Sequence, residues 1–219
     1  MKKLFVSSAV ALALSSSVVV AEESGAFVGV GLGYGGAKTT IDIGGAGAGA
    51  MAQKSNLSGS GMRYELIAGY KQFFTESFGL RYYGSFIYGD NTFKQDGANL
   101  KSNLMTYTAN VDALYNFVNS GDMDFGAFLG LGIGANTWSG KAVDTAKSLS
   151  EGQKLSTTGL DVALNVGLRG VFAKQHGVEL AARVPFMATT LINKTVEDVS
   201  MKSTMKPNYN VGVRYTFSF

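Results

Sequence analysis

The sequence predicts an all-β protein, an eight-stranded antiparallel up-and-down transmembrane β-barrel. The stretch from Asn208 to Phe219 alternates strictly between polar and apolar side chains, as a strand does when its two faces meet different surroundings. Seven earlier stretches alternate in the same way. Only 16% of the residues are charged, below the ~25% of typical soluble chains. No run after the N-terminus approaches the ~20 apolar residues of a helical membrane span.

The predicted strands are separated by connections that are alternately long and short. The strands are expected at 26–34, 62–71, 78–89, 105–115, 125–135, 160–169, 178–186 and 208–219. Long polar or small-residue loops are expected at 34–61, 90–102, 138–156 and 189–206, and short turns at 73–77, 119–122 and 174–177. Long extracellular loops and short periplasmic turns are typical of outer-membrane barrels. Pro185 lacks an N–H donor, so we expect it near a rim or a bulge.

The N-terminus has the pattern of a cleaved secretory signal peptide. Lys2 and Lys3 form a basic start, residues 4–20 are apolar or small, and Ala21 precedes the acidic Glu22. We therefore predict a signal peptide at 1–21 and a barrel domain at 22–219, in preference to a permanent helical anchor. Removing two of the 19 basic residues leaves 17 against 16 acidic ones. This near balance argues against a nucleic-acid partner.

Charged residues in the predicted strands fall on the face that points into the barrel. All five arginines of the chain do so, whereas almost every lysine lies in a loop, a turn or the signal peptide. An eight-stranded barrel is narrow enough for side chains to fill it, and arginine suits confined ion pairs with carboxylates. We interpret these residues as an ionic network that plugs the lumen, or alternatively as a narrow charged pore. A catalytic carboxylate pair is a remote third interpretation. The network residues are Arg63, Glu65, Arg81, Asp112, Asp161, Arg169, Glu179, Arg183 and Arg214.

Aromatic residues gather at two levels of the predicted outer face. Such belts lie at the two membrane–water interfaces of transmembrane barrels. One belt is expected at the extracellular rim, from Tyr34, Tyr64, Tyr88 and Trp138. The other is expected at the periplasmic rim, from Phe74, Phe78, Phe117, Phe172 and Phe219.

The sequence offers little for catalysis or for binding a cofactor. The chain has no Cys, and its one His, His176, falls in a predicted turn without ligand or triad partners. Gly31 to Gly36 matches a GxGxxG pattern, but it does not open a helix, so the nucleotide interpretation fails. We therefore expect no metal, no cofactor and no enzymatic activity.

Two segments resemble the Helicobacter outer membrane protein family. They are the hairpin formed by Gly69–Phe74 and Phe78–Gly84, and the terminal stretch Tyr209–Phe219. The resemblance implies a barrel in a bacterial outer membrane, in a family that includes porins and adhesins. Large adhesin members carry a long N-terminal extracellular domain, usually with Cys, and this chain has neither. In similar proteins a terminal aromatic is read by the barrel-assembly machinery, and Phe219 matches that position.

The function expected from the sequence is a structural or minor-pore role in the bacterial cell outer membrane. The expected partners are outer-membrane lipid, lipopolysaccharide and, during biogenesis, the assembly machinery. The alternative is an adhesin-like binding module that uses the loops around 35–60 and 142–156 to hold a host or surface ligand. An outer-membrane enzyme is the remote alternative, because its predicted extracellular rim has no His.

Overall fold

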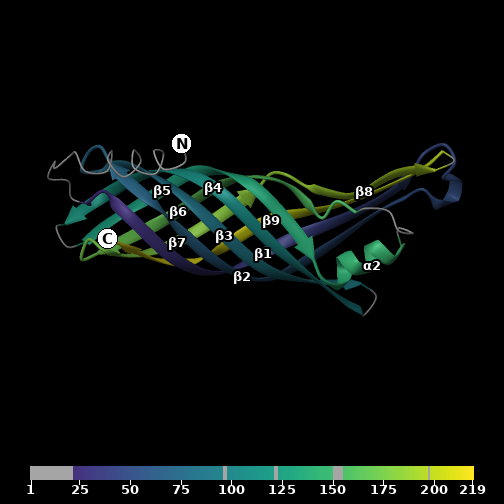
Figure 1. Ribbon diagram of the computed structural model, residues 1–219, viewed down its shortest axis with the longest axis horizontal. Helices are drawn as coiled ribbons and strands as arrows, with labels where there is room; N and C mark the ends of the chain where they lie inside the picture. Colours follow the sequence, from purple (N-terminus) through teal and green to yellow (C-terminus); the bar gives the residue numbers. More distant parts are fainter. Residues whose placement is uncertain (1–21, 96–97, 121–122, 150–154, 197) are drawn as a thin grey trace, which may run out of the picture.

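The computed structural model describes residues 22–95, 98–120, 123–149, 155–196 and 198–219. The predicted signal peptide at 1–21 lies outside them, as does part of the turn predicted at 119–122. The described residues form nine strands and two short helices (Figure 1). The strands are β1 (Gly25–Gly44), β2 (Gln53–Phe73), β3 (Phe78–Gln95), β4 (Ala98–Ser120), β5 (Met123–Ser139), β6 (Thr158–Phe172), β7 (His176–Pro185), β8 (Thr189–Val196) and β9 (Val199–Ser218). The helices are η1 (Gly49–Met51) and α2 (Lys141–Leu149).

The strands close into a ring with eight positions, which confirms the predicted barrel. Strands β1 to β7 pair in sequence order, β7 pairs with β9, and β9 pairs with β1, every pair being antiparallel. Strand β8 pairs with the part of β9 beyond the reach of β7, so β7 and β8 together occupy one position. Pro185 is the last residue of β7, where the strand breaks. The pairing of β1 with β9 leaves the ring no open edge there.

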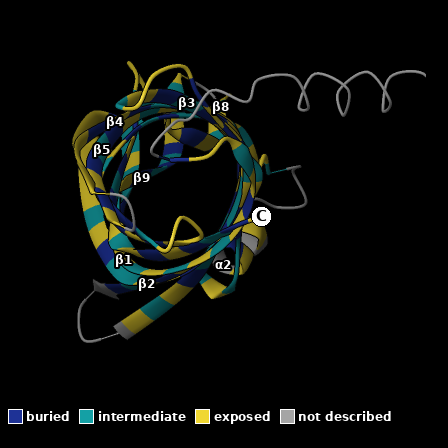
Figure 2. Ribbon diagram, turned by 90° about the vertical axis from the view of Figure 1, so that its left-hand side faces the viewer, coloured by how far each residue is buried: buried dark blue, intermediate teal, exposed yellow. Residues whose placement is uncertain are grey.

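Apolar side chains cover the outside of the ring and polar side chains fill its inside. Along β9, Val211, Val213 and Tyr215 are exposed, whereas Arg214 and Thr216 are buried. Figure 2, which looks along the ring, shows buried and exposed residues alternating along much of the strands. This is the pattern of a barrel whose outer face contacts lipid. Among the described helices, none is long and apolar enough to cross a membrane.

The prediction of long loops is largely wrong, because strands occupy most of those segments. The stretch 34–61 contains the end of β1 and the start of β2, 90–102 contains the ends of β3 and β4, and 189–206 contains β8 and the start of β9. The stretch 138–156 is a connection of another kind, since it holds α2. Beyond the membrane a strand needs no apolar face, so its backbone can pair while its side chains read as loop residues.

Four strands of the same sheet continue past the rest of the ring, and this part is here called the extension. Its strand order is β8, β9, β1, β2, from residues 189–196, 199–206, 38–44 and 53–58. Pairing between β2 and β3 begins only at Gly59, so among the described residues this part of β2 is paired with β1 alone. The extension lies at the end opposite the C-terminus (Figure 1), which we call the hairpin end. The other end, where β1 begins and β9 finishes, is the terminus end.

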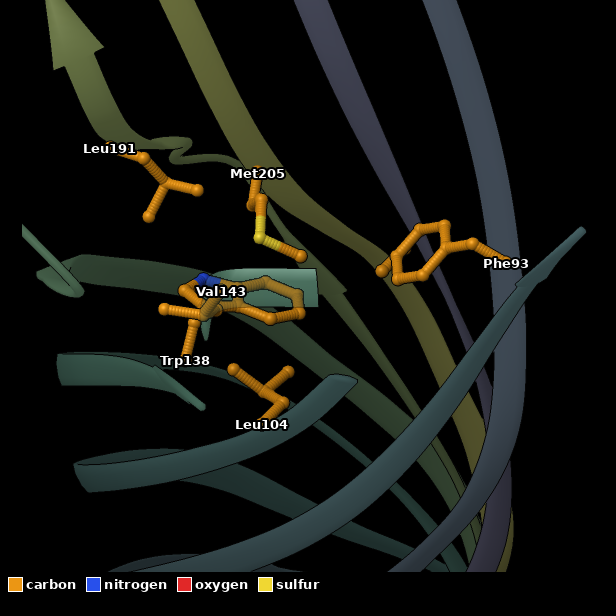
Figure 3. Packing of buried hydrophobic residues seen from close by; sticks show 7 residues of the cluster. Phe93, Leu104, Trp138, Val143, Leu191 and Met205 are labelled. Carbon is orange, nitrogen blue, oxygen red and sulfur yellow. The ribbon is translucent and has the colours of Figure 1, made fainter. Parts of the chain in front are cut away.

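An apolar cluster, here called the cap, fills the inside of the barrel at the hairpin end (Figure 3). Its residues come from six strands and from α2: Ala37, Phe93, Leu104, Trp138, Val143, Leu191 and Met205. The placement of Trp138 in an outer aromatic belt is therefore wrong. Inward positions of β5 have even numbers, and Trp138 continues that series to the end of the strand. The other three tyrosines of that belt are exposed or half-buried on the outer face.

Candidate functional site

The charged residues predicted inside the barrel are all buried there. Each of the nine is at most 7% exposed, and they come from β2, β3, β4, β6, β7 and β9. The structure brings seven of the nine together in ion pairs with one another. Arg169 has its carboxylate partner outside the predicted set, and Arg63 has no carboxylate partner among the described residues.

Arg81 lies at the centre of the largest group. Its Nη2 atom is 2.8 Å from Oδ2 of Asp112 on the neighbouring strand, and Nε is 3.0 Å from the same oxygen. It also donates from Nη1 to Glu179, across the barrel on β7. The guanidinium lies over three aromatic rings, with the ring centre of Phe128 4.5 Å away. Arg81 therefore joins two acids and is held in place by packing as well as by charge.

Glu179 and Glu65 extend this group toward β9. Arg214 binds Glu65 with two hydrogen bonds of 2.7 and 2.9 Å, the two-point geometry that suits arginine. A second guanidinium nitrogen, Nη1, is 3.7 Å from Oε2 of Glu179. A continuous chain of charges, here called the ionic chain, thus crosses the lumen: Asp112, Arg81, Glu179, Arg214 and Glu65.

Toward the hairpin end the charges are compensated differently. Arg183 donates to Asp161, whose other oxygen accepts a hydrogen bond of 2.9 Å from Asn136. Arg63 donates instead to neutral acceptors: the carbonyl of Asp90 at 2.8 Å and the side-chain oxygen of Asn91 at 2.6 Å. Toward the hairpin end, Arg183 is therefore paired with an acid, and Arg63 is compensated by hydrogen bonds to neutral oxygen atoms.

A third group at the terminus end includes residues that the predicted network omits. Glu22 precedes β1, and its buried carboxylate accepts hydrogen bonds from Arg169 at 2.5 and 2.8 Å and from Lys71 at 2.7 Å. Asn116 donates to it as well, at 3.0 Å. Burial raises the pKa of Glu22, but Arg169 and Lys71 outweigh burial and lower it to about 2.

The alternation of β2 already places Lys71 on the inward face, but Glu22 gives no such signal because it lies outside any strand. Arg169 and Glu179 stand opposite each other on β6 and β7, yet each is paired with another residue. Strand register therefore identifies which residues are adjacent, but it does not identify the ion pairs, because long side chains also reach partners across the lumen.

Small voids remain between these side chains. Two have volumes of about 10 Å³ and a third about 20 Å³, each with room for about one water molecule. Arg63, Arg183 and Asn210 line two of them, and the side-chain oxygen of Asn210 has no protein partner. Within the described residues there is no group of His, Cys, Asp and Glu arranged to hold a metal ion. His176 contacts Tyr215, with Nδ1 2.7 Å from the hydroxyl oxygen.

The fold is shared with one solved outer-membrane protein of low sequence identity, and two further solved structures are more distantly similar. The outer membrane protein OprG of Pseudomonas aeruginosa is 16% identical, with 91% of this chain and 100% of that chain covered and a TM-score of 0.51. Neisserial surface protein A is 14% identical, with 90% of this chain and 100% of that chain covered and a TM-score of 0.43. Ail of Yersinia pestis is 16% identical over 88% and 99%, with a TM-score of 0.34. No curated protein matches the sequence.

A family model, described as Helicobacter outer membrane protein, matches residues 65–219. The match runs from the middle of β2 to the end of β9 and includes both segments that carried the resemblance. It covers more than half of the chain and agrees with the ring of antiparallel strands and its apolar outer face. The protein is therefore located in the bacterial outer membrane, and the chain belongs to the Helicobacter outer membrane protein family.

Proposed function

We propose that this protein is a small structural barrel of the outer membrane whose lumen is closed by ion-paired side chains. One observation carries the proposal: the ionic chain from Asp112 to Glu65 crosses the lumen and joins five of the eight ring positions. In this role the barrel stabilises the envelope rather than moving solutes. The predicted signal peptide at 1–21 would be removed, and the terminus end would face the periplasm.

The cost of breaking buried ion pairs supports a closed state over the minor pore. Separating the partners of such a pair leaves an uncompensated buried charge, which costs about 3–5 kcal/mol of free energy. A hydrated ion that passed Arg81 would have to displace its contacts with both Asp112 and Glu179. The void beside Arg81 and Glu179 has a volume of about 10 Å³, which is room for about one water, and toward the hairpin end the cap is apolar.

Single-channel recording in a planar lipid bilayer tests this proposal. We expect no steady conductance from the refolded wild-type barrel, and rare or small openings when Arg81→Ala removes the centre of the ionic chain. Asp112→Ala is the matched variant, since it removes a single end of that chain. A stable ohmic conductance in the wild type would overturn the closed barrel and favour the pore.

A second candidate function is binding at the cell surface, and the extension favours it. Its four strands project beyond the ring and present polar outer side chains, whereas the sequence led us to expect loops there. Shortening the β1–β2 and β8–β9 hairpins together would remove this sheet and leave the ring intact. If cells expressing the shortened protein adhere to host cells as well as the wild type does, the binding role is wrong.

The proposal assigns no catalytic role to any of the residues that the structure describes. The remaining partners follow from location: outer-membrane lipid, lipopolysaccharide and the barrel-assembly machinery. Phe219 is 74% exposed on the outside of the terminus end, and its ring packs edge-on against Phe217. An accessible terminal ring at this place suits a signal that assembly machinery reads.

A further inference from the structure

Two lysines face each other on the outer surface where the first and last strands meet. Lys38 on β1 is directly opposite Lys206 on β9. Their neighbours Ala37, Met205 and Pro207 are buried on the inner face, so the lysine side chains project outward. Side chains at directly opposite positions have Cβ atoms ≈ 4.5–5.5 Å apart, and like charges so placed destabilise the pairing.

Neither Lys38 nor Lys206 has a carboxylate partner among the residues that the structure describes. Lys54, further along the extension, lies 3.7 Å from Asp42. Lys202 is opposite Asp42 on the other side. In the part of the chain that the structure describes, no carboxylate pairs with Lys38, Lys202 or Lys206. The outer face of the extension therefore carries an excess of positive charge at the seam between β1 and β9.

The lysine pair lies just beyond an aromatic belt. Tyr209 faces outward beside Gly36, so closely that a Cβ on Gly36 would come within 2.6 Å of the tyrosine ring. Tyr34 also faces outward, and its hydroxyl is 2.6 Å from Oγ of Ser60. Outer-face tyrosines mark the edge of the hydrocarbon layer in membrane proteins. Lys38 is two residues beyond Gly36, about 7 Å along the strand.

That distance matches the position of lipid phosphates. A bilayer is about 40–45 Å thick with its headgroups and ≈ 30 Å without them, so the headgroup layer extends roughly 5–7 Å beyond the hydrocarbon. Lysines attract anionic headgroups at this level, and the attraction adds with each cation. The surrounding membrane thus supplies negative charge beside Lys38 and Lys206, which have no carboxylate partner among the described residues.

We propose that Lys38 and Lys206 together bind the phosphate group of a phosphorylated outer-membrane glycolipid, with Lys202 as an outlying contact. The bound phosphate would bridge the strands that close the ring, because one lysine comes from β1 and the other from β9. A ligand that binds the closed barrel and not the unfolded chain stabilises the closed form. The lipid is then a cofactor of barrel closure, whether or not the lumen conducts.

The test uses the mature chain folded in detergent and titrated with bisphosphorylated lipid A. Native mass spectrometry measures retained lipid, and gel migration after heating measures the temperature at which the folded band is lost. The variant is Lys38→Ala/Lys206→Ala. Its matched control is Lys54→Ala/Lys101→Ala, which removes the same charge from outward-facing positions away from the pair. Dephosphorylated lipid A, inorganic phosphate and heparin are titrated in parallel.

We expect lipid A to bind the wild type and raise its melting temperature, and the lysine pair variant to bind it on the order of 10- to 30-fold more weakly. The control should stay within about threefold of the wild type. Inorganic phosphate and the dephosphorylated lipid should give no protection. Equal weakening in both variants, or none in either, would overturn the site. Lysine-dependent binding of heparin without binding of lipid A would also overturn it, in favour of a soluble sulfated glycan.

Discussion

The inside of the barrel is filled by opposite kinds of side chain in two regions, the ionic chain around Arg81 and the cap around Trp138. Around Arg81 the buried groups are charged, and almost every one has a specific partner on another strand. Around Trp138 the buried groups are apolar, and the indole Nε1 has no hydrogen-bond partner. The ion-paired region depends on the identity of each partner, whereas the apolar region does not.

This difference predicts different tolerance to change. A buried ion pair is costly when one partner is lost, because the remaining charge is stranded in a medium of low dielectric constant. An apolar cluster loses only the transfer free energy and packing of the atoms removed, and it accepts swaps of similar volume. Substitutions in the ionic chain should therefore be costly when they remove a charge, whereas substitutions in the cap should be costly only when they change the side-chain volume.

Replacing Arg81 with Met should give the largest effect. The change keeps much of the side-chain volume but leaves Asp112 and Glu179 without their central cation, so we expect the free energy of unfolding to fall by about 3–5 kcal/mol. Urea-induced unfolding in lipid vesicles, followed by the fluorescence of Trp138, would measure it. Arg63→Met is the matched control, since Arg63 binds neutral acceptors. Equal losses in the two variants would contradict the role of pairing.

Acid should weaken the terminus end of the lumen and spare the cap. The folded pKa of Glu22, about 2, lies below its ordinary value of 4.5. Its stabilisation is therefore complete above pH 4.5 and is lost as the pH falls toward 2, by about 2–3 kcal/mol. The temperature at which the folded gel band disappears should drop across this range. Glu22→Ala should flatten that part of the profile, and an unchanged slope would assign the effect to another acid.

The smallest effect should come from Trp138→Phe in the cap. Phenylalanine removes the unpartnered indole N–H along with some volume, and these changes oppose each other. We expect a loss of no more than about 1.5 kcal/mol, measured by the melting of the folded gel band. A loss comparable to that of Arg81→Met would mean that the cap is as exacting as the lumen, and the contrast between the two regions would fail.

The alternation of side chains predicted the barrel and its inward arginines, because strand geometry fixes which face each residue occupies. It did not predict the extension. Residues such as Thr39 and Thr204 lie beyond the apolar part of the strands. Where both faces of a strand are polar, the backbone can pair although the sequence shows no alternation. Glu22 was not predicted as part of the network for a related reason. It lies outside any strand, so alternation cannot place it, and only the folded chain brings it to Arg169. The cap was missed because Trp138 was assigned to a loop.

The ionic chain also limits the order in which the protein can enter a membrane. Glu65 and Arg214 are 149 residues apart, and Arg81 and Glu179 are 98 apart, so most of the chain must be present before these pairs form. A single strand that crossed the hydrocarbon alone would carry an unpaired charge with it, at a cost of several kcal/mol. A β3–β4 hairpin would carry the Arg81–Asp112 pair with it, but Glu65 on β2 has its partner, Arg214, on β9. Pairing of Glu65 therefore couples the insertion of β2 to the closure of the ring by the last strand.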